Sequence, residues 1–304
     1  METKKEIDAF RALKIIFGVI AKVLIYGFLV FWALTTIFPL IWSFMNSFKD
    51  KKMIVKNSFS LPLGDLFTID NYKLIFENYH ILGAYRNSII ISCSVSVFVI
   101  LFAGMAAYIL ARYNFVGKNV LTGLLYAGMM FPIFSTIIPM YMMETKMGLV
   151  NNPHVTSQTG QLALSLIAVI LPQIAGNLSF AIIVLMSYIK GLPVELEEAA
   201  YMEGCNIFQI FFKVILPLSK PSFVTVGIFG FLWSYNDLFT QMFFLRTPER
   251  YAITVLLNNI SSREGTNYGM MMASVSLIVI PVIIVYLCLQ KYIIKGMVVG
   301  AVKG

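Results

Sequence analysis

Six long apolar stretches, each without a charged residue in its middle, constrain this 304-residue chain more than any other feature. A helix needs about 20 apolar residues to cross the hydrocarbon core of a bilayer. The stretches lie at Val23–Phe44, Ser88–Ala111, Val120–Met143, Gln161–Tyr188, Pro217–Asn236 and Met270–Gln290. The sequence therefore predicts an all-α, polytopic membrane protein with six transmembrane helices.

The composition excludes the other broad classes of protein. Hydrophobic residues make up 59% and charged residues 12% of the chain, against about 45–50% and about 25% in globular domains. Intrinsic disorder requires the opposite bias, towards low hydrophobicity and high charge. The net charge is +8, but the basic residues lie between the apolar stretches rather than on one patch. This placement favours a membrane-flanking role over nucleic-acid binding.

Six spans place both termini on the same side of the membrane. Lys and Arg are slightly more frequent on that side, which favours the cytoplasm, although the long segment after the first span carries several bases on the other side. We therefore expect an N-in, C-in topology. Residues 1–22 would form an amphipathic cytoplasmic lead-in, residues 23–294 the transmembrane domain, and residues 295–304 a cytoplasmic tail.

Sites for catalysis or for metal binding are not evident in the sequence. The cysteines, Cys93, Cys205 and Cys288, are odd in number and far apart, and His80 and His154 are isolated, so neither a disulfide framework nor a zinc site is predicted. The sequence has no phosphate-binding loop and no nucleophile–base pair. We expect a protein that is not an enzyme and has no cofactor. The uncharged spans also argue against an ion-coupled carrier.

Two amides lie near the middle of the fourth span. Gln173 and Asn177 are four residues apart and so share one helix face. An amide that faces lipid costs free energy, so both should face a neighbouring helix or a wet cavity. An interhelical hydrogen bond and a place on a solute's path both remain open.

Aromatic residues crowd the outer end of the fifth span. Trp233 and Tyr235 precede Asn236 and Asp237. Rings beside amide and carboxylate groups are typical of a sugar site, and an interfacial aromatic belt explains the rings equally well. The candidate substrate-path residues are Gln173, Asn177, Trp233, Tyr235, Asn236 and Asp237.

The loop between the fourth and fifth spans, Gly191–Pro221, is the most informative segment. Its glutamates, Glu195, Glu197 and Glu198, favour the positive end of a helix dipole. Gly204 is predicted to end this helix, and Asn206 to cap a second one.

One narrow face of the predicted helix carries Leu196, Ala199, Ala200 and Glu203. Small residues let a partner surface approach closely, and a carboxylate among them requires a cationic partner if it is buried. A helix lying on the membrane surface is the alternative, but acidic side chains are unfavourable beside an anionic leaflet. A protein partner is therefore preferred.

This loop resembles the EAA loop of ATP-binding-cassette importer permeases. That family has an EAA triplet, a glycine in the next turn and, after a spacer, an Ile-x-Leu-Pro segment. The chain has Glu198-Ala199-Ala200, then Gly204, then Val214-Ile215-Leu216-Pro217. It departs from the pattern at Val214, where Ile is usual, and at Cys205, where Ala is usual.

The resemblance covers most of residues 80–304 and is nearest to the second permease subunit of maltose-type carbohydrate importers. Segments in the same order as in those importers are RNS, AAYILARYNFVGKN, MGLVNNP, GLPVELEEAA, WSYND and VGAVKG. In WSYND, two residues separate Trp233 from Asn236, where that family often has Trp-Asn directly.

The resemblance implies a type I ABC importer fold with its core at about residues 84–294 and a coupling loop at 190–217. In that family a coupling helix docks into a cleft on a cytoplasmic ATPase, which uses the ATP. The residues expected to couple to the ATPase are Glu198, Ala199, Ala200, Glu203, Gly204, Leu216 and Pro217.

The resemblance also implies partners: a second permease subunit, an ATPase dimer and an extracytoplasmic solute-binding protein that delivers oligosaccharide to outer loops such as 148–160. The expected setting is the lipid of a prokaryotic cytoplasmic membrane, with no nucleic acid. One alternative is a similar permease for glycerol phosphate, polyamine or amino acid; another is a secondary carrier or channel. An anionic cargo would favour basic groups in the cavity, and the spans show none.

Overall fold

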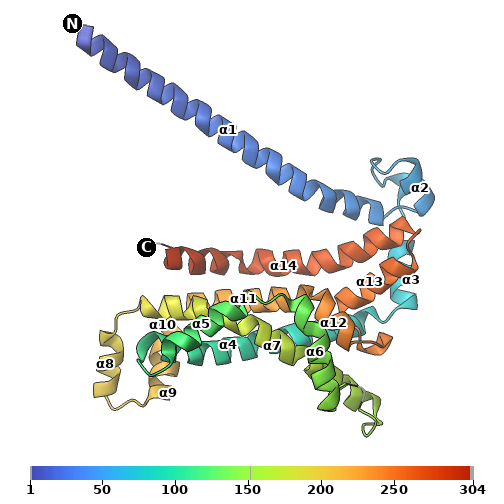
Figure 1. Ribbon diagram of the computed structural model, residues 1–304. Coiled ribbons are helices and arrows are strands. Elements are labelled where there is room, and N and C mark those ends of the chain that lie inside the picture. Colours follow the sequence, from blue (N-terminus) through green and yellow to red (C-terminus); the bar gives the residue numbers. More distant parts are fainter. Residues whose placement is uncertain (1, 151, 302–304) are drawn as a thin grey trace. The chain divides into compact units, whose positions relative to one another are not determined.

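The computed structural model describes residues 2–150 and 152–301, with side chains described for 14–132, 134–150 and 152–291 (Figure 1). Every regular element in the described ranges is a helix. The chain divides into two units, residues 1–74 with 264–276, and residues 75–263 with 277–304.

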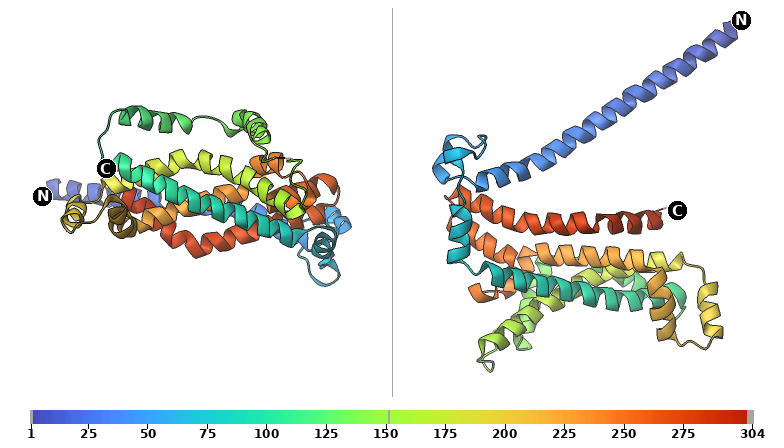
Figure 2. Two further views of the ribbon diagram at one scale, coloured as in Figure 1. Left: turned by 90° about the horizontal axis from the view of Figure 1, so that it is seen from below. Right: turned by 180° about the vertical axis from the view of Figure 1, so that it is seen from behind.

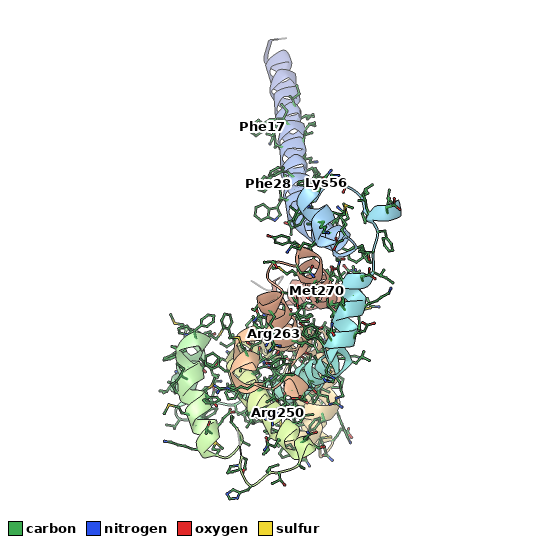
Figure 3. All side chains as sticks on the ribbon, turned by 90° about the vertical axis from the view of Figure 1, so that its right-hand side faces the viewer. Phe17, Phe28, Lys56, Arg250, Arg263 and Met270 are labelled. Carbon is green, nitrogen blue, oxygen red and sulfur yellow. The ribbon has the colours of Figure 1, made fainter. Side chains whose placement is uncertain are left out.

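The first unit contains α1 (Glu2–Ser47), α2 (Lys51–Lys56), η1 (Gly64–Leu66) and the start of α3 (Asp70–Asn78). The most apolar window of α1 is 0% buried, and the side chains of Phe17 and Phe28 project outward from it (Figure 3). A helix that is apolar all round needs lipid or another protein to cover it. The helix is continuous across the expected boundary at residue 22; the side chains of residues 1–13 of the lead-in lie outside the described ones.

Asn71 fixes the end of α1 within this unit. Its Nδ2 donates to the carbonyl oxygens of Ser47 (2.8 Å) and Lys49 (2.9 Å). The Lys49 side chain is fully buried, its Nζ donates to the Ser58 carbonyl (3.2 Å), and burial lowers its pKa. A Cβ on Gly269, at the start of α14 (Tyr268–Ala301), would lie 2.7 Å from the Lys49 oxygen. The backbones therefore meet where only a glycine fits.

The second unit is organised around α4 (Ile81–Arg112), α7 (Gln158–Lys190) and α11 (Lys220–Asn236), which lie side by side (Figure 2). Small residues allow membrane helices to approach closely. The Ser96 hydroxyl donates to the Gly227 carbonyl (2.8 Å). The buried stripe of α4, at helical spacing, is Ile91, Val95, Val99, Ala103 and Ala107.

Shorter helices surround these three. They are α5 (Lys118–Gly128), α6 (Ile133–Lys146), α8 (Glu195–Met202), α9 (Ile207–Ile210), the π-helical turn η2 (Phe211–Ile215), α10 (Leu216–Leu218), α12 (Leu238–Phe244), η3 (Pro248–Arg250) and α13 (Ile253–Arg263). The remainder of α14 also belongs to this unit. In Figure 1, α8 and α9 lie at one end of the three-helix bundle and α12 and α13 at the other.

The structure and the predicted spans agree in part. Within the described part of the chain, four helical stretches are long and apolar enough to cross a membrane: Lys14–Ser47, Ile81–Arg112, Gln158–Lys190 and Tyr268–Lys291. They correspond to the first, second, fourth and sixth predicted spans. The fifth corresponds to α11, which continues from Ile207–Leu218 through an 83° bend.

The structure of the chain at the third predicted span differs from the prediction. We expected one transmembrane helix over Val120–Met143, and the structure has α5 and α6 with a break between them. Pro132 has no N–H to donate and disfavours a helical conformation of the residue before it, which weakens the helix at the point where the structure ends it. The count of six spans stays a prediction.

Candidate functional site

The turn after α8 is built as the sequence predicted. Gly204 has φ +80°, in the left-handed region that favours glycine. Its N–H donates to the Tyr201 carbonyl (3.0 Å), and the N–H of Cys205 donates to the Ala200 carbonyl (3.1 Å). These two bonds form a Schellman motif, which closes the helix.

The predicted cap at Asn206 is also confirmed. Its side-chain oxygen accepts from the Gln209 N–H (2.9 Å), and the Gln209 side chain accepts from the Asn206 N–H (2.9 Å). This capping box satisfies donors that α9 would otherwise leave free. The turn between α8 and α9 is therefore held by hydrogen bonds on both sides.

Most of the predicted coupling residues are accessible. Glu198, Ala199, Glu203 and Gly204 are exposed on α8 and its turn, as is Leu196 of the predicted helix face. Ala200 is half-buried and packs against the core of the unit. Beyond α8, Leu216 is half-buried and Pro217 exposed.

The exposed side of α8 carries two further apolar side chains that sequence reasoning did not single out. Tyr201 is 62% and Met202 is 89% exposed. Together with Leu196 and the carboxylates of Glu198 and Glu203, they form an exposed surface that we call the α8 surface. Apolar groups rimmed by charges are typical of a surface that binds another protein.

One of the three glutamates of α8, Glu197, faces the protein interior. Its carboxylate accepts a hydrogen bond from Nε of Arg112, the last residue of α4, and the two side chains are 10% and 12% exposed. Nη2 of Arg112 also donates to the Leu192 carbonyl (2.9 Å). Sequence reasoning missed this pair. The available signal was an arginine closing one span and a glutamate in the first turn of a later helix.

A cavity of about 700 Å³ lies between α5, α6, α7 and α11. Its size is typical of a small-molecule site. Gly128, Met129 and Phe131 line it from the end of α5 and the break that follows. Non-helical backbone at membrane depth is tolerated where it lines a cavity, which gives the break in the third predicted span a structural reason.

Gln173 connects α7 to α11 at the wall of this cavity. It is 3% exposed, its Nε2 donates to Oδ2 of Asp237 (2.9 Å), and its Oε1 accepts from the Ser234 hydroxyl (2.6 Å). Both ends of the amide are therefore satisfied by neighbouring groups. Gln173 makes the interhelical hydrogen bond that was one of its two open roles, and it also lines the cavity; its place on a solute's path stays a prediction.

The network continues away from the cavity into α12 and α13. Oδ1 of Asp237 accepts from the Thr240 N–H (3.0 Å) and so caps α12. Nε2 of Gln241 donates to the Ser234 carbonyl (2.7 Å), and its Oε1 accepts from the Thr254 hydroxyl (2.7 Å). The cavity wall is thus bonded to both short helices at this end of the bundle.

The structure brings four of the six predicted substrate-path residues to the cavity: Gln173, Asn177, Trp233 and Asp237. Trp233 packs against Phe180, with ring centroids 4.9 Å apart. Tyr235 is buried and Asn236 is exposed, and neither is among the described residues that line this cavity. Ser234, Gln241 and Thr254 were not singled out because their pairing depends on how the helices meet.

Comparisons with known proteins agree with this architecture. Residues 83–299 match the family described as "Binding-protein-dependent transport system inner membrane component". The chain is 32% identical to a putative ABC transporter permease protein of Caldicellulosiruptor sp., over 91% of this chain and 95% of that protein. It is 31% identical to the arabinooligosaccharides transport system permease protein AraQ of Halalkalibacterium halodurans, over 94% and 98%.

A solved structure supports the same assignment. The chain resembles a chain of a bacterial ABC transporter that imports the acidic polysaccharide alginate, with a TM-score of 0.72, 26% identity and coverage of 91% of this chain and 96% of that one. The family match covers more than two thirds of the sequence. The chain is therefore a member of the binding-protein-dependent transport system inner membrane component family, the permeases of ABC importers.

Proposed function

We propose that this chain is a permease subunit of an ATP-driven importer of neutral oligosaccharides and that an ATPase docks on the α8 surface. The observation that carries the proposal is the position of the EAA-like motif. Its residues lie on an exposed helix at one end of the bundle, whereas Asp237, on the wall of the cavity, caps a helix at the other end (Figure 1).

The α8 surface has the chemistry of a docking element. Three glutamates in the first turn of α8 suit the helix dipole, and Glu198 remains exposed for a cationic group of a partner. Tyr201 and Met202 expose apolar side chains that a partner would cover. Glu198, Ala199 and Gly204 match the motif with which related permeases contact their ATPase.

A separate motor follows from what the sequence lacks. It has no phosphate-binding loop and no catalytic constellation. We infer that the chain is not an enzyme and holds no cofactor, and that ATP is used by partner subunits. The further partners are a second permease subunit, a solute-binding protein outside the membrane and the surrounding lipid, with both termini in the cytoplasm.

The lining of the cavity favours an uncharged polyhydroxy cargo. Gln173, Asn177 and Trp233 provide amides and an aromatic ring. Asp237 is the one charged residue among the described lining residues, and it is acidic. A lone carboxylate repels an anion, so we expect the cargo to resemble the arabinooligosaccharides of one relative more than the alginate of the structural neighbour.

Uptake by cells with and without this chain tests the proposal. The probes are radiolabelled arabinotriose, maltotriose, trehalose and diacetylchitobiose, compared with alginate trisaccharide, glycerol 3-phosphate and spermidine. We expect ATP-dependent uptake of at least one neutral sugar and none of the charged probes. Exclusive uptake of a charged probe would overturn the cargo assignment.

Purification of the tagged chain tests the coupling assignment. We expect it to bring down a second permease and an ATPase that carries a phosphate-binding loop. A triple replacement of Leu196, Tyr201 and Met202 by Ser should release the ATPase and keep the second permease. Solute transport by the isolated chain without ATP would instead support a carrier or a channel.

A further inference from the structure

We propose that the ion pair between Arg112 and Glu197 fixes α8 to the end of α4, so that a displacement of α8 by a docked ATPase moves α4 with it. The inference rests on the proposed function of the α8 surface. It adds two positioning residues that do not themselves belong to that surface.

The geometry of Arg112 makes it a tie between separate segments. It is the last residue of α4. Its Nε donates to Glu197 in the first turn of α8, and its Nη2 donates to the Leu192 carbonyl in the link between α7 and α8. A guanidinium holds several donors in one rigid plane, so it fixes the direction of α8 as well as its distance.

Burial makes this tie hard to break. The Arg112 and Glu197 side chains are 12% and 10% exposed. The other ion pair among the described residues, between Asp70 and Lys73, is 69% and 58% exposed. Exposed pairs contribute little, whereas removing one partner of a buried pair leaves an uncompensated charge in the interior. The two pairs are therefore not equivalent, and the buried one is the harder to break.

Hydrogen bonds at the other end of α4 lead towards the cavity. The Ser88 hydroxyl accepts from the Ile253 N–H (2.8 Å), and Nδ2 of Asn87 donates to the Tyr251 carbonyl (3.1 Å). The adjacent Thr254 bonds to Gln241, which bonds to Ser234 on the cavity wall. Rigid elements and hydrogen-bond networks of this kind can carry coupling between distant sites. The pair thus connects α8 to a continuous path along α4.

Neutral and charge-swapped variants test the pair in the complex with its ATPase and binding protein, reconstituted in liposomes. For Arg112→Gln and for Glu197→Gln we expect the ATPase to remain bound and to hydrolyse ATP. Sugar imported per ATP should fall about tenfold, within the ordinary range of coupling between sites. The double variant Arg112→Glu with Glu197→Arg should recover part of the loss. Glu195→Gln removes a neighbouring exposed charge of α8 and should couple as the wild type does.

A distance measurement tests whether the Arg112–Glu197 pair holds α8 to α4, and it requires no transported sugar. Spin labels at Glu195 on α8 and at Val116 after α4 report whether the two elements move together, with Cys93, Cys205 and Cys288 replaced by Ala; both labelled positions are exposed and lie outside the α8 surface. In the otherwise unchanged complex we expect one narrow distance distribution with and without trapped ATP. In Glu197→Gln the distribution should broaden.

Two results would overturn the inference: neutral variants that couple and hold the distance as the wild type does, or neutral variants that simply lose the ATPase. Both leave the proposed function standing if the unmodified complex imports a neutral sugar. Failure of the unmodified chain to bind an ATPase would refute the proposed function instead. The two failures are therefore distinguishable.

Discussion

Replacing Gly204 tests whether the turn after α8 must be held in its left-handed conformation. Gly204 has φ +80°, and a Cβ added there would meet nothing within 4 Å in this chain. The cost of Gly204→Ala therefore comes from the backbone alone, about 1–2 kcal/mol. A cost of this size lowers the population of the observed turn by about 5–30-fold relative to alternatives.

A series of substitutions at Gly204 distinguishes the effect of backbone strain from the effect of side-chain size. Asn enters the left-handed region more readily than Ala, and a β-branched residue enters it least. Strain therefore predicts that function falls in the order Gly204→Asn, Gly204→Ala, Gly204→Val. Steric exclusion from a docked partner predicts that Asn is worse than Ala, because Asn is larger.

Hydrogen exchange by mass spectrometry over residues 199–206 measures the turn, since the amides of Gly204 and Cys205 are bonded in it. Recovery of the ATPase and sugar uptake measure the consequence. Gly64→Ala is the matched control, because Gly64 has φ +55°, equally open space and a position in the other unit. Wild-type exchange and uptake in Gly204→Ala, or a rank order that follows side-chain volume, would refute the reasoning.

Two further predictions concern packing and pH. Gly104→Ala places a Cβ 2.5 Å from Cε1 of the buried Phe223, and this overpacking should destabilise the protein by about 1–3 kcal/mol. Thermal unfolding in detergent measures the loss as a lower midpoint temperature. The control is Gly123→Ala, whose added Cβ meets nothing within 4 Å and should not lower the midpoint. Hydrogen bonds from Thr68 and Lys73 lower the pKa of the Asp70 carboxyl group. These bonds therefore stabilise the start of α3 fully at a pH above the unfolded-state pKa of Asp70, and this stabilisation is lost as the pH falls through the folded-state pKa. Amide exchange over residues 70–74 should lose protection at a higher pH in Thr68→Val than in the wild type, and identical pH profiles would contradict this cause.

Features set by local chemistry were predictable from the sequence. Apolar length correctly identified the four helices of the described residues that are long enough to span a membrane, because the thickness of the hydrocarbon core sets the length that such a helix needs. Gly204 and Asn206 were assigned correctly since a left-handed turn and a helix cap each depend on neighbouring residues alone. The EAA-like motif identified the family for a similar reason, its spacing being local.

Features that depend on which segments meet were not predictable. The Arg112–Glu197 pair joins residues 85 positions apart, and the Gln173–Asp237 bond joins residues 64 apart. The free-energy cost of exposing an amide to lipid indicates that Gln173 faces the protein or a cavity, but not which partner it finds. The break between α5 and α6 was also missed, since prolines within α6, α7 and α14 leave those helices continuous. Only the surrounding packing decides whether a proline kinks a helix or ends it.

The right-angled junction before α11 has a mechanical consequence. Ile207–Leu218 meets α11 at 83°, and twelve helical residues form a lever arm about 18 Å long. A push of 1 Å at the tip of this arm, across its axis, rotates a rigid junction by about 3°, which swings the far end of a helix as long as α11 by about 1.4 Å. The π-helical turn η2 lies within the arm. The stiffness of its five residues therefore determines how much of a displacement at the tip of the arm would reach α11.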